Sequence, residues 1–397
     1  MRITIVIAGL GGGGAERVCV NLANAWVERG YKPTILTISQ NSRPPAYPID
    51  PRVELRDLGW PRWARSYELN AKAIAPILRG LQVAGCPELI HDIKMLALLR
   101  YAILSTAPHI VVSLIDQTNV RVLAAMYEAQ ARVIVCEVTD ARRVTLRAWQ
   151  RARELLYPRA ASVVTPDQAI SDWFSARGCQ TRAIPSPLMG PSVSTSALPP
   201  TPTLPSTPAV PIPTNSTSRK RVITLSRLSM EKRPEWLLRA FASIANDHPD
   251  WDLELYGLGP QQNTLEHLAE KLAPPGRIRF RGFTNDPYAV LAGADIFVSA
   301  SRIEGFGNAI WEALASGVPV IAMDAGPSIA KLVRHGIDGL VVNENTMAAL
   351  ATALERLMTN ETERKSFASR APEVTDRFSL EAALTQWDEL LSLSRIH

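Results

Sequence analysis

The sequence has few cysteines and histidines, and none in a metal-binding or redox spacing. Cys19, Cys86, Cys136 and Cys179 all lie in the first half of the chain without a CxxC pair. Scattered thiols of this kind are typical of reduced, buried cysteines, which argues against a disulfide framework. The six histidines show no HExxH or i, i+4 spacing. A zinc site is therefore not expected.

Long hydrophobic runs are also absent. Stretches such as Ile110–Leu114 and Val318–Met323 are far shorter than the roughly 20 residues that a membrane-spanning helix needs. The apolar run Ile3–Leu10 leads directly into a glycine loop and a helical pattern, so we interpret it as a first core strand and not as a signal peptide. We expect a cytoplasmic protein.

What the sequence does contain is typical of a large globular protein. Its 397 residues are 46% hydrophobic with a mean hydropathy of +0.00, which predicts about two domains. The net charge of +5 is uneven, because residues 1–190 carry 23 Lys and Arg against 15 Asp and Glu, whereas residues 191–397 carry 20 against 23. The basic first half suggests an anionic partner, either a phosphorylated substrate or an acidic membrane surface.

Short runs rich in Val and Ile alternate with helix-length amphipathic segments in both halves of the chain. This alternation predicts an α/β fold of two Rossmann-like domains, each with a parallel sheet, that face a central cleft. The predicted strands are Arg2–Ala8, Lys32–Thr37, Ile110–Ser113, Arg132–Cys136 and Ser162–Val164, and then Val222–Ser226, Asp252–Tyr256, Ile278–Phe280, Ile296–Ser299, Val318–Met323 and Leu340–Val342.

A Pro/Ser/Thr-rich tract separates the two halves. Ten of the 30 prolines lie between Pro185 and Pro213, and such a tract favours an extended, semi-rigid linker. We therefore predict a first domain over 1–188, a linker over 189–219 and a second domain over 220–376. A final helix within 377–397, which contains Trp387, is expected to cross back to the first domain.

Two loops have the composition of phosphate-binding segments. Gly9–Arg17, GLGGGGAER, places Gly12, Gly13 and Gly14 before a helix, either to contact phosphate or substrate or only to form a tight turn. In the second half, Arg227 and Lys232 follow a strand and precede a helix that is predicted to begin at Pro234. This pair could clamp a diphosphate, or it could be a solvated basic loop.

The third signal is a pair of glutamates eight positions apart, Glu304 and Glu312, in EGFGNAIWE. Asn308 is predicted to cap a short helix that ends before Gly317. Glu304 would then lie in the preceding loop and Glu312 within the helix. The two carboxylates would serve different parts of one ligand.

These motifs resemble a known family. The matching segments extend over most of the chain outside the linker and residues 40–100. They are GGGAER, LLYPRAASVV, IPSP, RLSMEK, LYGLGP, EGFGNAIWE, GVPVIA, and AGPSI followed by HGIDGLVV. The second half resembles the donor domain of the retaining GT-B glycosyltransferases of family GT4. The first half resembles the acceptor-binding domain of its bacterial branch that assembles exopolysaccharide, lipopolysaccharide and oligosaccharide.

The resemblance implies a role for each motif residue. Arg227 and Lys232 would grip the donor diphosphate, Glu312 would bind the ribose, and Glu304 would lie beside the donor sugar, so that Glu304, Arg227 and Lys232 carry catalysis. The remaining implied donor-binding residues are Gly305, Phe306, Gly307 and Asn308, whose backbone would follow the sugar and phosphates. In the first domain the polar residue that faces the donor sugar stays open among Asp116, Asn119, Glu137 and Asp140.

The implied reaction is transfer of a hexose or N-acetylhexosamine from a nucleotide sugar, with uridine favoured, to a lipid-linked or polysaccharide acceptor. The resemblance implies retention of configuration and no metal or other cofactor, and we interpret Asp250-Trp251-Asp252 as structural. The alternatives are a GT-B-like sugar-nucleotide epimerase, a phosphorylase or a non-catalytic nucleotide-sugar-binding scaffold.

Two basic segments with aromatic residues lie in the first half. Arg142–Arg159 and Trp60–Arg79 could dock peripherally on the inner face of an anionic membrane, or could be solvated helix faces that pack on their own domain. No nucleic-acid-binding motif is present, and a nucleic-acid partner is not expected.

Overall fold

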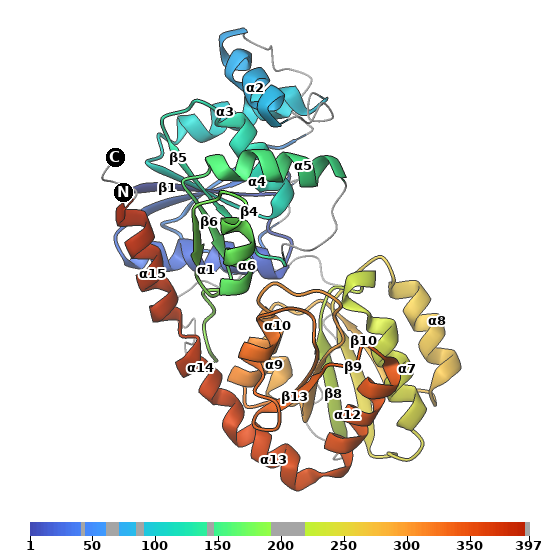
Figure 1. Ribbon diagram of the computed structural model, residues 1–397. Helices are drawn as coiled ribbons and strands as arrows, with labels where there is room; N and C mark the ends of the chain where they lie inside the picture. Colours follow the sequence, from blue (N-terminus) through green and yellow to red (C-terminus); the bar gives the residue numbers. More distant parts are fainter. Residues whose placement is uncertain (41–43, 61–70, 85–90, 141–146, 192–218, 394–397) are drawn as a thin grey trace. The chain divides into compact units, whose positions relative to one another are not determined.

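The computed structural model describes residues 1–40, 44–60, 71–84, 91–140, 147–191 and 219–393 (Figure 1). Within these ranges the chain forms two compact units. Residues 1–187 and 380–393 belong to the first, and residues 188–191 and 219–379 to the second. Most of the predicted linker, 189–219, lies outside the described residues.

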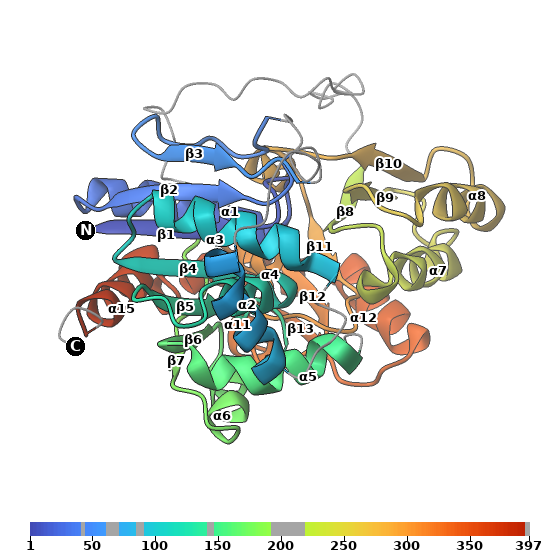
Figure 2. The ribbon, with the colours of Figure 1, turned by 90° about the horizontal axis from the view of Figure 1, so that it is seen from above.

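The first unit contains a seven-stranded parallel sheet with the strand order β3-β2-β1-β4-β5-β6-β7 (Figure 2). Its strands are β1 (Arg2–Ile7), β2 (Lys32–Thr37), β3 (Glu54–Asp57), β4 (Ile110–Leu114), β5 (Arg132–Cys136), β6 (Ser162–Thr165) and β7 (Thr181–Ala183). Its helices are α1 (Gly14–Glu28), α2 (Ala71–Ala84), α3 (Ile93–Ser105), α4 (Asp116–Ala125), α5 (Arg147–Leu156), the 3₁₀ turn η3 (Tyr157–Arg159), α6 (Gln168–Ser175) and α15 (Leu380–Leu393).

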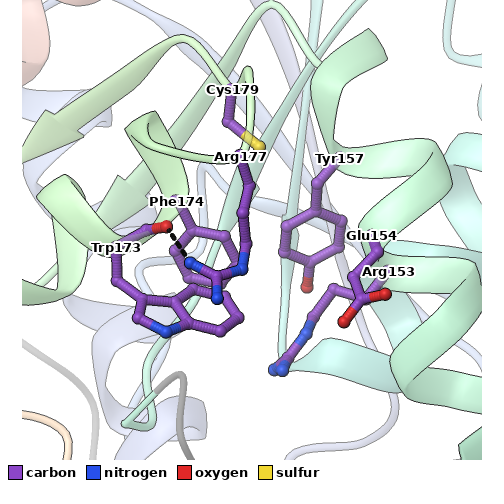
Figure 3. A pocket seen from close by; sticks show the side chains of 7 residues that line it. All are labelled: Arg153, Glu154, Tyr157, Trp173, Phe174, Arg177 and Cys179. Atoms are coloured by element: carbon purple, nitrogen blue, oxygen red, sulfur yellow. Dashed lines mark hydrogen bonds between the residues drawn. The ribbon is translucent and has the colours of Figure 1, made fainter.

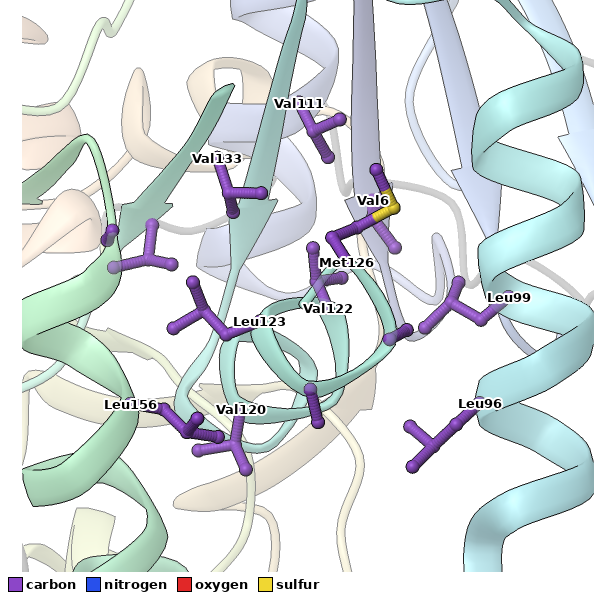
Figure 4. Close-up of a cluster of buried hydrophobic side chains, with 14 of the residues drawn as sticks. Val6, Leu96, Leu99, Val111, Val120, Val122, Leu123, Met126, Val133 and Leu156 are labelled. Atoms are coloured by element: carbon purple, nitrogen blue, oxygen red, sulfur yellow. The ribbon is translucent and has the colours of Figure 1, made fainter. Parts of the chain in front are cut away.

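Helices cover both faces of this sheet. Helices α2 to α6 pack on one face through a cluster that includes Val111 and Val122 (Figure 4). Helices α1 and α15 pack on the other, where the rings of Trp26 and Trp387 meet edge to face at 5.5 Å. Arg29 at the end of α1 also forms ion pairs with Glu381 and Asp388 of α15, so the last helix is fixed on the first unit.

The second unit contains a six-stranded parallel sheet with the order β10-β9-β8-β11-β12-β13. The strands are β8 (Lys220–Leu225), β9 (Trp251–Tyr256), β10 (Ile278–Gly282), β11 (Ile296–Ser299), β12 (Val320–Met323) and β13 (Gly339–Val342). The helices are α7 (Pro234–Ile244), α8 (Gln262–Leu272), α9 (Pro287–Leu291), α10 (Asn308–Ala315), α11 (Ile329–Leu332), α12 (Met347–Thr359), α13 (Glu361–Arg370) and α14 (Val374–Arg377), with the 3₁₀ turns η4 (Met230–Lys232) and η5 (Ala371–Glu373).

The two faces of the second sheet are also covered by helices. Helices α7, α8, α12 and α13 bury one apolar cluster, and α9, α10, α11 and α14 bury another. The predicted α/β fold with two parallel sheets is confirmed. The prediction omitted two strands, β3 and β7, which are short and lie at the two edges of the first sheet.

Candidate functional site

The loop after β8 presents the first two candidate residues. It contains Arg227, whose side chain is exposed, and continues through η4 to Lys232. Helix α7 begins at Pro234, as predicted, because the proline ring fixes φ and needs no hydrogen-bond acceptor in the first turn. Arg233 adopts a left-handed conformation, with φ of 48°, and turns the chain from η4 into α7.

Two glycines after β9 hold the Arg227 loop in place. A Cβ atom at Gly257 would lie 1.9 Å from the carbonyl oxygen of Ser226, and one at Gly259 would lie 2.2 Å from that of Leu228. The backbone amide of Leu228 donates to the carbonyl of Leu258 at 3.1 Å. The glycines of LYGLGP therefore allow two backbone segments to touch at the carboxyl edge of the sheet.

Replacing Gly259 by alanine is expected to lower the free energy of unfolding by about 1–3 kcal/mol, because the added methyl group meets backbone atoms that must shift. Urea denaturation measures this loss. Gly11→Ala is the matched control, since a Cβ atom there has nothing within 4 Å. Equal stability of wild type and Gly259→Ala would contradict the packing described for this loop.

Lys232 and Glu304 meet although 72 residues separate them in the sequence. The Nζ atom of Lys232 lies 2.6 Å from Oε1 of Glu304, and the hydroxyl of Ser301 donates to the same oxygen at 2.7 Å. The backbone amide of Glu304 donates to the carbonyl of Ala325 at 2.9 Å. The loops after β8, β11 and β12 are thus tied together at the carboxyl edge, which is where open parallel sheets bind ligands.

The helix that follows Glu304 differs from the prediction in its cap. Gly307, with φ of 93°, occupies the N-cap position of α10, and Asn308 is the first helical residue. Asn308 does not cap the helix, because the chain reverses in a left-handed conformation that glycine adopts without strain. Gly317, with φ of 75°, follows the end of the helix. The predicted helix is therefore present, with its N-cap one residue earlier than predicted.

Two of the predicted donor-binding residues in this segment, Phe306 and Glu312, have buried side chains. Phe306 is 3% exposed, and its ring meets that of Phe378 edge to face at 5.5 Å, so its side chain belongs to the core. Glu312 is 5% exposed and lies within α10. Gly305 lies in the loop that leads to α10, beside Phe306 and after Glu304. At Phe306 the prediction therefore rests on the backbone, as the sequence analysis stated, and donor contact there stays a prediction.

Replacing Glu312 by alanine is expected to weaken nucleotide affinity about tenfold to 100-fold, the loss of one or two hydrogen bonds to a charged group. Titration calorimetry with nucleoside diphosphates measures the change. Glu270→Ala, on the exposed surface of α8, is the control and should bind as wild type does. An unchanged dissociation constant in Glu312→Ala would remove this residue from the donor site.

The sequence prediction missed a second cationic pair at this edge. Arg302 is exposed and lies between Ser301 and Glu304, and its backbone amide donates to the carbonyl of Glu231 at 2.8 Å. Burial and the nearby charge of Arg302 lower the pKa of Arg233. The SRIEGFG context alone gave no sign of this proximity, because the two guanidinium groups come from separate loops.

Asp250-Trp251-Asp252 lies at the start of β9, with Asp252 buried and fully engaged by arginines. Its carboxylate lies 2.6 Å from Arg219, 3.2 Å from Arg277 and 3.0 Å from Arg279. Asp250 is half exposed and pairs with Lys220 at 3.1 Å. These contacts give both carboxylates a structural role, and among the described residues no group of three His, Cys, Asp or Glu is arranged to hold a metal ion.

The glycine loop of the first unit leads into α1. Gly12 has φ of 99°, its carbonyl accepts a hydrogen bond from the hydroxyl of Tyr47 at 2.8 Å, and Gly13 is the N-cap residue of α1. Gly13 has no side chain with which to cap the helix, and Gly14 is the first helical residue. The backbone amide of Leu10 donates to the Gln40 side chain at 2.6 Å. The loop is a braced turn at the start of a helix, and phosphate contact stays a prediction.

The four open candidates of the first unit occupy different environments. Asn119, Glu137 and Asp140 are buried, whereas Asp116 is partly exposed and begins α4. Asn119 and Glu137 both contact the hydroxyl of Tyr157. Of the four, only Asp116 has side-chain surface through which it could meet a ligand directly.

Some side chains of the basic segment Arg142–Arg159 make contacts within the first unit. Arg153 of α5 is 3% exposed and lies beside Glu137, and the guanidinium of Arg159 stacks on Tyr127 at 5.2 Å. Trp149 stacks with Arg121 at 4.9 Å. Residues 61–70 and 141–146 lie outside the described residues. Arg151 and Arg159 are exposed, so the described part of Arg142–Arg159 leaves both the membrane-docking and the self-packing interpretations open.

Residues 210–374, which include the RLSMEK and EGFGNAIWE segments, match the family model for glycosyl transferases group 1. The second unit resembles a glycosyl transferases group 1 domain. An exopolysaccharide phosphotransferase of Streptomyces coelicolor is 33% identical over 181 residues, which are 45% of this chain and 19% of that protein. The lipopolysaccharide core biosynthesis glycosyltransferase LpsE of Rhizobium meliloti is 32% identical over 173 residues, which are 43% of this chain and 49% of that protein. The chain thus matches about half or less of the length of these relatives.

Solved structures with similar folds cover nearly the whole chain. Staphylococcus aureus TarM, in complex with UDP and α-GlcNAc-glycerol, has a TM-score of 0.74 at 12% identity and covers 98% of this chain and 99% of its own. Anabaena HepE, in complex with UDP and glucose, has a TM-score of 0.72 at 19% identity and covers 99% of both chains. The fold is GT-B, and the comparisons support a glycosyltransferase.

One further structural finding concerns membranes. Within the described ranges, every helix is too short or too polar to cross a bilayer.

Proposed function

We propose that this protein is a retaining, metal-independent glycosyltransferase of family GT4 that transfers a hexose or N-acetylhexosamine from a nucleotide sugar, with UDP-sugars favoured. Several similar proteins support the class of donor and product. HepE was solved with UDP-glucose, and TarM with UDP, while LpsE is named for lipopolysaccharide core biosynthesis. The proposed acceptor is a lipid-linked oligosaccharide or a growing polysaccharide.

The contact between Lys232 and Glu304 is the observation that carries this proposal. Oε1 of Glu304 accepts from Lys232 and Ser301, and no hydrogen bond within the described residues engages Oε2. That second oxygen is suited to accept from a sugar hydroxyl. Lys232 could also donate to a phosphate oxygen. The ion pair would then lie between the sugar subsite and the diphosphate subsite.

The charges at this edge match the chemistry of donor cleavage. Breaking the bond between the anomeric carbon and the phosphate oxygen leaves negative charge on the nucleoside diphosphate. Arg227, exposed and without an ion-pair partner within the described residues, and Lys232 would stabilise that charge in the transition state. We propose front-side attack, in which the acceptor hydroxyl adds to the anomeric carbon while its proton passes to the leaving phosphate oxygen.

The first unit would bind the acceptor. The excess of positive charge in residues 1–190 suits a diphosphate-linked lipid, and we propose cytoplasmic location with peripheral contact with an anionic membrane. An epimerase, a phosphorylase or a silent scaffold is less well supported, because the relatives above carry the names of transferases.

A transfer assay tests the proposal. The protein would be incubated with UDP-glucose, UDP-galactose and UDP-N-acetylglucosamine, a prenyl-diphosphate-linked sugar acceptor and EDTA. We expect UDP release together with an α-linked product, identified by the anomeric coupling constant. An epimerised sugar without UDP release would favour the epimerase. Loss of turnover in EDTA would contradict metal independence, and a β-linked product would contradict retention.

A further inference from the structure

A buried carboxylate lies at the carboxyl edge of the first sheet, where it has no assigned role. Glu137 follows β5 directly and is 1% exposed. The hydroxyl of Tyr157 donates to its Oε2 at 2.9 Å, and that of Thr139 donates to its Oε1 at 3.0 Å. The guanidinium of Arg153 lies 3.8 Å from Oε2. Because the side chain is enclosed, Glu137 cannot touch a sugar and must act through its neighbours.

Those neighbours connect the loops after two central strands. The amide of Asn119 donates to the hydroxyl of Tyr157 at 3.0 Å and to the carbonyl of Cys136 at 2.9 Å. Its own oxygen accepts from the hydroxyl of Ser113 in β4 at 2.7 Å. One hydrogen-bonded chain therefore runs from β4 through α4 and η3 to the segment after β5.

The turn between β4 and α4 is strained at this point. Ile115 has φ of 76°, a conformation that a β-branched residue adopts only when its surroundings impose it. Its backbone amide donates to the carbonyl of Cys136 at 3.3 Å, the same carbonyl that Asn119 contacts. Asp116, the partly exposed candidate, is the next residue. The network thus holds the turn that carries Asp116, the one of the four candidates whose side chain is partly exposed.

The aromatic side chain in this network is itself held firmly. The ring of Tyr157 stacks on Phe174 at 5.5 Å, and the guanidinium of Arg153 lies 5.7 Å from the rings of Trp173 and Phe174. Figure 3 shows the tyrosine and Arg153 on one side of a small pocket, opposite Trp173 and Phe174. Tyr157 therefore has little freedom to reorient except by turning its hydroxyl hydrogen.

Both protonation states of Glu137 are accessible near neutrality. Burial raises the pKa of Glu137 to about 7. The guanidinium of Arg153 opposes this rise, as do the hydroxyls of Tyr157 and Thr139, whereas the negative charge of Asp116 adds to it. The buried Cys136 thiol also lies beside it, and the pKa of that thiol is raised by burial and by Glu137. The pKa of Tyr157 is also raised, so its hydroxyl stays protonated and can donate.

Protonation would reverse part of the hydrogen-bonded chain. The ionised carboxylate accepts from both hydroxyls. A protonated Glu137 has one hydrogen to donate, and the hydroxyl oxygens of Thr139 and Tyr157 already lie within hydrogen-bond distance. The hydroxyl that accepts this hydrogen loses its own acceptor, and a buried donor without an acceptor is costly.

We propose that Glu137 is a positioning residue whose ionised carboxylate, through Thr139 and Tyr157, holds the loops after β4 and β5 in the arrangement that turnover requires. Protonation releases those hydroxyls and lowers turnover. This role rests on the proposed glycosyltransferase function, which supplies the reaction to be measured.

The pH dependence of kcat tests the role. Wild type should lose activity on the acid side with an apparent pKa near 7. Tyr157→Phe removes a donor that stabilises the carboxylate, so this acid limb should move to higher pH. Glu137→Gln should show no such limb. Tyr31→Phe is the matched control, because Tyr31 donates to Asp388 at 2.9 Å elsewhere in the same unit and should leave the limb unchanged.

Thermal melting against pH gives a readout that does not depend on activity. The pKa of Glu137 is raised from 4.5 to about 7 on folding, so the folded state binds the proton more tightly. Wild-type stability should then fall as the pH rises through that window. In Glu137→Gln this part of the fall should disappear.

The possible outcomes separate the two proposals. If wild type turns over and the acid limb of its pH profile is unchanged in Tyr157→Phe and Glu137→Gln, the proposed role of Glu137 is overturned. The proposed transferase function is not affected by that outcome. An unchanged pH dependence of melting in Glu137→Gln would also overturn it. Absence of nucleotide-sugar turnover by wild type at every pH would count against the transferase function and this role together.

Discussion

Lys232→Ala is expected to lower kcat about 10²–10³-fold, the loss typical of removing one preorganised group that stabilises developing negative charge. Lys232 contacts Glu304 at 2.6 Å, so the substitution removes the proposed phosphate ligand and also leaves the carboxylate without this cation. UDP release under saturating donor measures the effect. The pair is partly exposed, and the protein should stay folded because such pairs contribute less than about 1 kcal/mol.

Lys271→Ala provides the matched control for charge and residue type. Lys271 lies in the last turn of α8 and is exposed, so its removal should leave kcat unchanged. A folded Lys232→Ala protein with kcat within threefold of wild type would contradict the assignment of Lys232 to the leaving diphosphate.

Asp252→Ala is expected to lower the free energy of unfolding by about 3–5 kcal/mol, because removing one partner of a buried ion pair leaves the others uncompensated. The carboxylate is 1% exposed and contacts three arginines, of which Arg277 is largely buried. Asp250→Ala removes a half-exposed carboxylate of the same motif and should cost less than about 1 kcal/mol.

Denaturation in EDTA and in Mn²⁺ distinguishes this structural role from metal binding. We expect the same loss for Asp252→Ala in both conditions. A variant as stable as wild type, inactive, and reactivated by millimolar Mn²⁺ would instead make Asp250-Trp251-Asp252 a metal site and overturn its structural interpretation.

The sequence predicted the sheet strands that are buried on both faces. Strands such as β4 and β12 are Val- and Ile-rich runs. Strands of this composition are typically buried on both faces, in a sheet that is covered by helices. Strands β3 and β7 escaped prediction because they are short edge strands with exposed or partly exposed residues, ELRD and TRA. Their apolar content is too low to distinguish them from loops.

The candidate site was predictable residue by residue but not as a geometry. Arg227, Lys232, Glu304 and Glu312 stand in recognisable local motifs, whereas the contact of Lys232 with Glu304 depends on the order of β8 and β11 in the sheet. The burial of the Phe306 side chain was not predictable either, because a motif does not show which side of a loop faces the core.

Other contacts were not predictable because they form between residues that are far apart in the sequence. The close approach of Gly259 to the Leu228 carbonyl and the proximity of Arg302 to Arg233 both join loops from different strands. The network around Glu137 likewise joins residues 113 to 157, and a buried glutamate has no local pattern that predicts it.

Nucleotide binding in the absence of metal tests the central claim most directly. Titration calorimetry with UDP, GDP and ADP in EDTA would compare wild type with Arg227→Ala. The donor site described for the second unit predicts that one nucleotide, expected to be UDP, binds wild type and that Arg227→Ala binds it at least tenfold more weakly. Wild-type protein that is folded and binds none of the three would contradict the glycosyltransferase assignment.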